Sequence, residues 1–134
     1  MTEFERELEL LQREGLKQSA LRREYEQKVG DLALLPPKLQ AEGKNEEEIA
    51  RTMHTARREL GRQYKEAAPP LLREYIYAAT AAKYGDPLGP DYESLRRRKS
   101  CAEVIEAAAR PIKNLDERIT IEGFREWYRR IEKN

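Results

Sequence analysis

Apolar side chains recur every three or four residues along most of the chain, and the period-two alternation of a half-buried strand is rare. The amino-terminal part predicts one long helix over residues 3–29. We expect Gly15 to bend this helix and Gly30 to end it, because glycine weakens a helix interior. Its apolar stripe consists of Phe4, Leu8, Leu11, Leu21, Tyr25 and Val29.

Capping residues and prolines divide the rest of the chain into further helices. Pro36 and Pro37 begin a short helix that Gly43 stops, because proline is favoured in a first helical turn and glycine after the last. Asn45 followed by three glutamates begins a long amphipathic helix that ends before Pro69. The next helix runs from Pro70 to about Lys83. It carries apolar or aromatic residues on most faces, so we expect it to be the central helix of the fold.

A stiff Gly/Pro turn over residues 85–90 follows, and three shorter helices complete the pattern. We expect Tyr92 and Leu95 to be buried in the first of these, and the pair Arg110-Pro111 to end the second. Residues expected to face inward in the last two helices are Cys101, Val104, Ile105 and Ala108, then Phe124, Trp127, Tyr128 and Ile131. The prediction is an all-α fold of six or seven helices in one compact domain, with residues 31–134 as a helical core beside the long helix of residues 1–30.

Composition narrows the classes of function without selecting one. Among 134 residues there are 26 basic and 25 acidic side chains, so any surface that binds nucleic acid must come from local clustering of charge. A single cysteine excludes an internal disulfide and a multi-cysteine zinc site. No apolar run approaches the roughly 20 residues that span a bilayer.

The charges are unevenly distributed along the chain. Residues 51–65 hold five cations against one acid, and Arg96 begins a second cluster that continues to Lys99, whereas residues 1–14 are acidic. A basic surface of this kind can bind phosphates or an acidic protein partner. The alternative is a set of ordinary solvated helix faces.

His54 is the only histidine and so the only side chain whose ordinary pKa suits proton transfer near neutral pH. Arg57 or Arg58 and Lys65 lie on the same helical stripe. An imidazole beside cations is the combination that a metal-independent ribonuclease needs to hold a phosphodiester and to move its proton. The alternative is a boundary histidine among solvated arginines.

The Gly/Pro turn and its neighbours offer weaker candidates. Tyr84 can act as an acid or base or stack on a nucleobase, although tyrosine is more often a core residue. Asp86 and Asp91 would hold a metal with one more ligand such as His54, or would simply initiate a turn and cap a helix. Burial is the better interpretation of Cys101. We predict no metal site and no cofactor.

Several segments together resemble the helical carboxy-terminal toxin domains of bacterial polymorphic toxins, which end large secreted proteins of the Rhs type. The resemblance covers roughly residues 32–111. Its most specific element is Lys83-Tyr-Gly-Asp-Pro-Leu-Gly-Pro90, followed by the helix start at Lys99-Ser100. It implies a toxic effector with a cognate immunity protein, made in the bacterial cytoplasm and, once secreted, acting in the cytoplasm of the target cell. The run Arg96-Arg97-Arg98 and the tail from Ile112 depart from the pattern.

Two classes of function follow. The first is an antibacterial toxin domain, a metal-independent ribonuclease or other nucleotide-directed enzyme, whose imidazole and guanidinium groups open onto one pocket walled by the Gly/Pro turn. The second is a helical interaction module without an active site, such as an adaptor or an immunity-like protein. For the first, the expected catalytic residues are His54, Arg58, Tyr84 and Asp86, and the expected nucleic-acid-binding residues are Arg57, Arg62, Lys65, Lys83 and Arg96.

Overall fold

The computed structural model describes residues 1–14, 20–110 and 119–133, and these residues form helices and connecting turns with no strand among them. The all-α prediction is therefore confirmed. Within that part of the chain no helix is long and apolar enough to cross a membrane. The elements are α1 (Glu3–Glu14), α2 (Ala20–Asp31), the short 3-10 helix η1 (Leu32–Leu34), α3 (Leu35–Ala41), α4 (Glu46–Glu66), α5 (Pro70–Tyr84), α6 (Tyr92–Arg96), α7 (Cys101–Ala108) and α8 (Ile121–Glu132).

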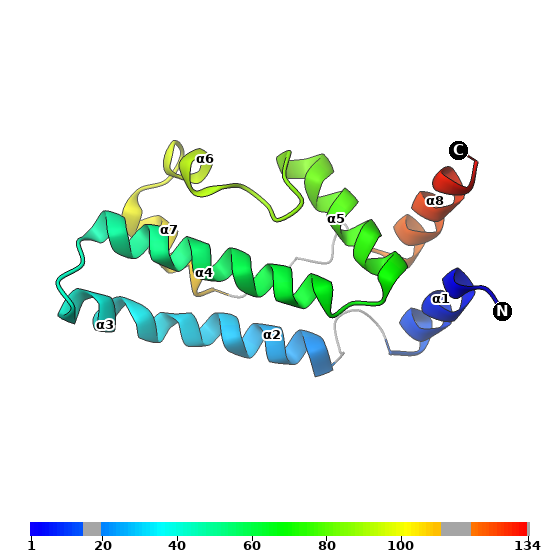
Figure 1. The fold of residues 1–134 in the computed structure, drawn as a ribbon, viewed down its shortest axis with the longest axis horizontal. Coiled ribbons are helices and arrows are strands. Elements are labelled where there is room, and N and C mark those ends of the chain that lie inside the picture. The colour runs from blue at the N-terminus through cyan, green and yellow to red at the C-terminus, as the bar shows by residue number, and fades with distance from the viewer. Residues whose placement is uncertain (15–19, 111–118, 134) are drawn as a thin grey trace.

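The region predicted as one long amino-terminal helix contributes two helices with different partners. Helix α1 packs against α5 and α8, whereas α2 packs against α4 (Figure 1). The predicted bend at Gly15 lies outside the described residues, as does Pro111. Gly30 does not end α2, which continues to Asp31. The reason is that Asp31 keeps a right-handed helical conformation and leads directly into η1, so no left-handed glycine cap is needed.

The predicted capping residues are in place. The Asn45 side chain accepts a hydrogen bond from the Glu48 amide at 2.8 Å, and the Glu48 carboxylate accepts one in return, which closes a capping box. Ser100 and Glu103 form a second capping box, and Asp91 caps α6. These short-range bonds fix where α4, α6 and α7 begin.

Helix α4 is the central helix, so the assignment of that place to α5 was wrong. It contacts η1, α2, α3, α5, α6 and α7, whereas α5 lies toward one end with α1 and α8 (Figure 1). The physical reason is that the place of a helix in the fold depends on its length and not on its apolar content alone. Helix α4 is the longer of the two and α5 the more apolar. The 21 residues of α4 reach along most of the molecule, while the apolar faces of α5 are used by the two terminal helices.

Two groups of buried side chains hold these parts together. At the end formed by the termini, Phe124 is fully buried among residues of α1 and α5. Along α4, Met53 packs against α3 and α7, and Ala50 packs against Tyr92 and Val104. The expected docking of the last helix is confirmed for Phe124, Trp127 and Tyr128.

Ile131 was expected to face inward with these residues, but it is exposed, with 41% of its surface accessible. Phe4 stacks on Tyr128 with ring centroids 4.1 Å apart, and the two chain ends lie at the same end of the molecule (Figure 1). Helix α1 begins only one residue before Phe4. The last turn of α8 therefore extends past the start of α1.

Candidate functional site

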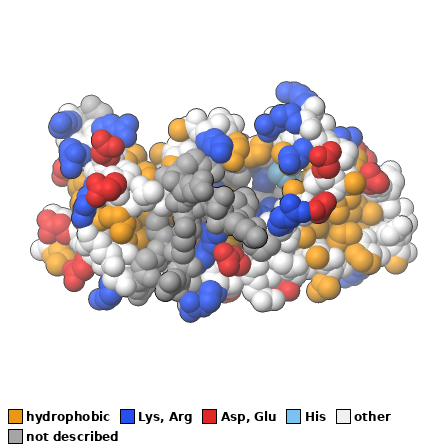
Figure 2. Space-filling model, turned by 180° about the vertical axis from the view of Figure 1, so that it is seen from behind, with side chains coloured by type: hydrophobic (Ala, Val, Ile, Leu, Met, Phe, Trp, Pro, Cys, Tyr) orange, Lys and Arg blue, Asp and Glu red, His pale blue; other side chains and the backbone are white. Residues whose placement is uncertain are grey.

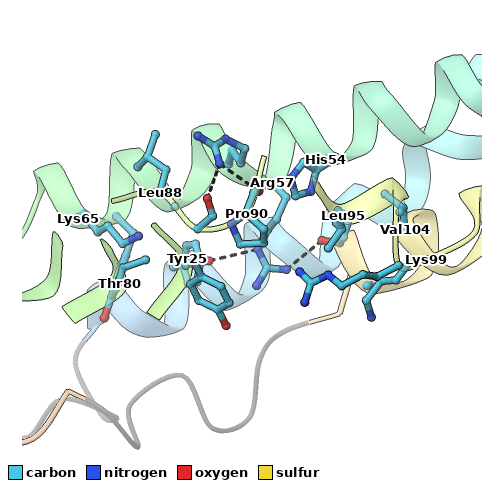
Figure 3. A pocket seen from close by; sticks show the side chains of 18 of the residues that line it. Tyr25, His54, Arg57, Lys65, Thr80, Leu88, Pro90, Leu95, Lys99 and Val104 are labelled. Carbon is cyan, nitrogen blue, oxygen red and sulfur yellow. Dashed lines mark hydrogen bonds between the residues drawn. The ribbon is translucent and has the colours of Figure 1, made fainter. Parts of the chain in front are cut away.

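A pocket of about 560 Å³ lies between α4, the segment that follows α5, and α7. Its volume falls within the range of small-ligand sites. On the face shown in Figure 2, Lys and Arg side chains stand around a hollow, with hydrophobic side chains among them. In Figure 3 the pocket extends from Lys65 and Thr80 at one end to Lys99 and Val104 at the other.

One wall of the pocket is the 85–91 segment, which contains the stiff turn expected over residues 85–90 from its glycines and prolines. Gly85 has φ 76° and ends α5 in the left-handed conformation, and Gly89 has φ 92°. The Asp86 carboxylate accepts a hydrogen bond from the Leu88 amide at 2.8 Å, which is the turn-forming role expected for this residue. The backbone conformation of this turn therefore follows from its own glycines and from Asp86.

Three side chains of α4 attach this segment to the helix by binding its backbone carbonyls. His54 Nε2 donates to the Pro90 oxygen at 2.9 Å. The Arg58 guanidinium donates to the Gly89 and Pro90 oxygens at 2.8 and 3.1 Å, and it pairs with the Asp86 carboxylate at 3.3 Å. Lys65 Nζ donates to the Pro87 oxygen at 3.2 Å. Arg58 and Lys65 therefore hold the wall in place as well as charge it, and the His54 ring helps to hold it.

The environment of His54 fixes its protonation state. The residue is buried, with 8% of its surface exposed. Burial lowers the pKa of His54 below its ordinary value of 6.5, and the charges of Arg58 and Arg57 lower it further, although the Pro90 carbonyl opposes this. The ring is therefore neutral at pH 7. Because a carbonyl oxygen only accepts, Nε2 carries the hydrogen and Nδ1 carries the free lone pair.

Arg57 is a fixed cation on another wall of the pocket. Its NH1 donates to the carbonyl oxygens of Ala108 and Arg110, both at 3.0 Å, and its Nε donates to the Tyr25 hydroxyl at 3.3 Å. Tyr25 in turn stacks on Tyr64 with ring centroids 4.7 Å apart. Carbonyl and hydroxyl partners orient the guanidinium group but do not neutralise its charge.

The structure brings five of the nine predicted site residues to the same pocket. They are His54, Arg57, Arg58, Lys65 and Tyr84. Asp86 does not line the pocket but joins the group through its ion pair with Arg58. The expectation that the histidine and its neighbouring cations share one concavity beside the Gly/Pro turn agrees with this geometry.

The other three predicted residues point elsewhere. Arg62 forms an ion pair with Glu59 at 2.6 Å on the exposed side of α4. Arg96 binds Glu47 at 3.1 Å, and Lys83 lies over the Tyr84 ring at 5.4 Å. None of the three lines the pocket.

Sequence reasoning did not select two cations that do line it, Arg98 and Lys99. Both belong to the same basic run as Arg96. Helix α6 ends at Arg96 and the backbone turns before Ser100, with the amides of Arg98 and Lys99 bonded to the Leu95 oxygen. This turn gives adjacent side chains different directions. The capping signal at Ser100 marks the turn in the sequence but does not show which cations face the pocket.

A second polar cluster, around Glu47, fastens α6 and α7 to the start of α4. Its carboxylate accepts from the Tyr92 hydroxyl and the Cys101 thiol, both at 2.7 Å. The Cys101 and Tyr92 hydrogen bonds and Arg96 lower the pKa of Glu47 to about 2. Burial and this carboxylate raise the pKa of Tyr92 to about 12, and the carboxylate and burial raise the pKa of the Cys101 thiol. Cys101 is thus buried, as expected, and its raised pKa favours the thiol over the thiolate.

The described residues contain no group of three or more His, Cys, Asp or Glu side chains placed to hold a metal ion. The proposed combination of Asp86, Asp91 and His54 is used in other ways. Asp91 accepts from the Ser94 amide at 2.7 Å, Asp86 pairs with Arg58, and His54 binds a carbonyl.

Comparison of the chain with known protein families, with curated proteins and with solved structures finds no significant match.

Proposed function

We propose that this chain is an antibacterial toxin domain that cleaves RNA without a metal ion. On this proposal the pocket holds a phosphodiester, and His54 acts at its wall as the proton acceptor. A cognate immunity protein neutralises the domain in the bacterium that makes it, and the secreted domain acts in the cytoplasm of the target cell. The resemblance to polymorphic toxin domains supports the toxin assignment and the immunity protein. The pocket supports the cleavage of RNA.

One observation carries the enzymatic part. A neutral imidazole, whose Nδ1 lone pair can accept a proton, lines the same pocket as Arg57, Arg58 and Lys65. Phosphodiester cleavage without a metal needs a base for the nucleophile and fixed positive charge for the phosphate oxygens. Two of these cations, Arg57 and Arg58, are already oriented by backbone carbonyls, so little reorganisation is needed when an anion binds.

The reaction that fits these groups uses the ribose 2′-hydroxyl as the nucleophile. His54 Nδ1 takes the proton of that hydroxyl, and the 2′-oxygen forms a bond to phosphorus while the bond from phosphorus to the 5′-oxygen breaks. The departing 5′-oxygen takes a proton from water, and the hydroxide left behind takes the proton from His54 Nδ1, so the ring returns to its neutral form. The products are a 2′,3′-cyclic phosphate and a free 5′-hydroxyl, and DNA is not a substrate because it lacks the nucleophile.

Toxicity in bacteria tests this proposal. The wild-type chain and His54→Gln are expressed separately in cells without an immunity protein, with Arg62→Gln as a matched control on the exposed side of α4. His54→Gln keeps a donor for the Pro90 oxygen but has no basic nitrogen. We expect the wild type and Arg62→Gln to stop growth and to degrade RNA, and His54→Gln to do neither. Equal toxicity of the wild type and His54→Gln contradicts the role of His54, and a harmless wild type contradicts the toxin assignment.

The interaction-module alternative also has a specific observation in its favour. His54, Arg58 and Lys65 all bind backbone carbonyls of the 85–91 segment, so they have a structural role that requires no substrate. This alternative predicts that the wild-type chain is harmless and that it purifies as a stable stoichiometric complex with a protein partner. It also predicts that purified chain leaves RNA intact, whereas the ribonuclease cleaves it with an excess of chelator present.

A further inference from the structure

The cations around the pocket differ in how they are used within the fold. Arg57 and Arg58 are held by carbonyl oxygens, and Arg58 also has an acidic partner in Asp86. Arg98 and Lys99 are exposed, and their side chains form no ion pair within the described part of the chain. Hydrogen bonds from Ser100, together with the charge of Lys99, lower the pKa of Glu103, the one acid that lines the pocket among the described residues. Lys99 stands at the α7 end of the pocket, near Val104 (Figure 3), and Arg98, its neighbour in the chain, lines the same pocket. Two adjacent exposed cations against one acid leave a net positive charge that can bind an anion.

The rest of the pocket surface suits a flat, mainly apolar group. Leu88, Pro90, Leu95 and Val104 line it, and Tyr84 lies at its edge with 39% of its surface exposed. Aromatic and proline surfaces of this kind stack against nucleobases with little regard to sequence. A volume of about 560 Å³ accommodates a small ligand but not a base-paired helix.

From the apolar walls and the two exposed cations together, we propose that the pocket binds one unpaired nucleotide, with its base against the apolar wall and a phosphate on Arg98 and Lys99. The inference rests on the proposed function, because it names the part of the RNA that the pocket takes. It makes the domain selective for single-stranded RNA without a strong preference for base sequence. It also makes free nucleoside monophosphates weak competitive ligands.

Direct binding measurements test this inference without depending on cleavage. Titration calorimetry on the wild-type chain uses adenosine monophosphate, adenosine and inorganic phosphate as separate ligands. We expect the nucleotide to bind at least tenfold more tightly than either of its parts, because only the nucleotide occupies both subsites. Equal affinity for phosphate and for the nucleotide contradicts a base subsite, and no binding at millimolar nucleotide contradicts the inference as a whole.

Variants locate the phosphate subsite. The double substitution Arg98→Ala and Lys99→Ala is expected to weaken nucleotide binding at least tenfold, while Arg97→Ala in the same run is expected to leave it unchanged because Arg97 does not line the pocket. Thermal unfolding verifies that all variants are folded. An unchanged affinity in the double variant contradicts the assignment of the phosphate to these two residues.

The nucleotide can come from solution or from an RNA strand, and His54→Gln, which lacks the basic nitrogen needed for cleavage, distinguishes the two sources. We expect His54→Gln to bind a short single-stranded RNA at least as tightly as the free nucleotide, and a duplex of the same sequence at least tenfold more weakly than the single strand. Binding of the free nucleotide alone, with no binding of single-stranded RNA, contradicts a site for RNA. If the wild type binds the nucleotide but is neither toxic nor able to cleave RNA, the proposed function fails and the pocket assignment stands.

Discussion

Two helical glycines have opposite surroundings although both lie where alanine would have the better helix propensity. A Cβ added at Gly123 would lie 2.1 Å from the Tyr75 hydroxyl and 3.0 Å from the Thr120 hydroxyl, whereas a Cβ at Gly30 meets nothing within 4 Å. Tyr75 is buried, so it cannot move away freely. Gly123 is therefore a point of close approach between α5 and α8.

We expect Gly123→Ala to lower the free energy of unfolding by about 1–2 kcal/mol, because overpacking outweighs the gain in helix propensity. Gly30→Ala is the control and is expected to raise that free energy by about 0.5–1 kcal/mol, since only the propensity changes. Urea unfolding of both variants measures the difference. A stabilised Gly123→Ala would show that Tyr75 can move away from the added methyl group.

His54 should make stability depend on pH, because its pKa is lowered in the folded protein. The unfolded chain takes up a proton near pH 6.5, while the buried ring resists protonation until a lower pH. Acid therefore favours the unfolded state, and the stability contributed by the neutral ring is present above pH 6.5 and is lost as the pH falls toward the folded pKa. We expect the free energy of unfolding to fall between pH 7 and pH 5, with a slope of at most about 1.4 kcal/mol per pH unit.

The control for this prediction is His54→Gln, which removes the only histidine of the chain and leaves the other titrating groups in place. Denaturant unfolding at a series of pH values compares the two proteins. The free energy of unfolding of the wild type minus that of His54→Gln should become smaller or more negative as the pH falls, whatever its sign at pH 7. Parallel curves would mean that the ring titrates alike in the folded and unfolded states.

At the residue scale, the sequence supports part of the site and not the rest. Helical periodicity alone places His54, Arg58 and Lys65 on one stripe, and the structure places all three at the pocket. Their bonds to the 85–91 segment depend on residues more than twenty positions away. No local pattern encodes such contacts, so the degree of burial of His54 was not predicted either.

Helix α1 is joined to the start of α5 by the side chain of Glu7. This buried carboxylate accepts from the Leu71 and Leu72 amides at 3.1 and 2.8 Å. Helix α5 begins at Pro70 and its preceding residue gives no side-chain cap, so a residue from another helix supplies the acceptor. A negative charge is also favoured at this end of the helix dipole.

We expect Glu7→Ala to lower the free energy of unfolding by about 1–2 kcal/mol and to speed hydrogen exchange at the Leu71 and Leu72 amides. Glu9→Ala, which changes an exposed residue of the same helix, should alter neither quantity appreciably. Amide exchange followed by NMR resolves the two sites. Unchanged protection of both amides in Glu7→Ala would show that the cap does not hold α5.

The 85–91 segment depends on α4 in a similar way. Arg58 bonds to Gly89, Pro90 and Asp86 with 23% of its side chain exposed, whereas Arg62 has only an exposed pair with Glu59. We expect Arg58→Met to lower the free energy of unfolding by about 1–3 kcal/mol, because it leaves part-buried carbonyls without a donor. Arg62→Met should leave the melting temperature nearly unchanged. Equal effects of the two substitutions would argue against a role for Arg58 in holding the segment.

At the element scale, local signals were sufficient for helix starts and insufficient for helix packing. Asn45, Asp91 and Ser100 were recognisable as caps because each bond is made within three residues. The central place of α4 was missed, because the apolar content of α5 indicates how many faces it buries but not what covers them. The cap that Glu7 supplies to α5 was equally out of reach, since it joins residues 64 or 65 positions apart.

At the scale of the whole molecule, part of the balance of charge is local. Many cations away from the pocket lie beside an acid within the fold. Ion pairs of this kind are Arg22–Glu26, Arg51–Glu93, Arg62–Glu59, Arg96–Glu47, Arg110–Glu106 and Arg125–Glu122. Where these pairs lie, an acid offsets the attraction of the cation for a long nucleic acid, so we expect most of the binding energy to come from the pocket.

This distribution of charge predicts how RNA binding responds to salt. Each phosphate contact on a single strand contributes about −0.7 to the slope of log affinity against log salt concentration. If the pocket takes one nucleotide and the two phosphates that flank it, the slope should lie between about −0.7 and −1.4, and it should not steepen when the strand is lengthened. Fluorescence anisotropy with labelled RNAs of increasing length, using His54→Gln to prevent cleavage, measures both quantities. A slope near −3 or steeper would instead indicate an extended basic surface, and the outward-facing cations Arg62 and Lys83 would then return as candidates for nucleic-acid binding.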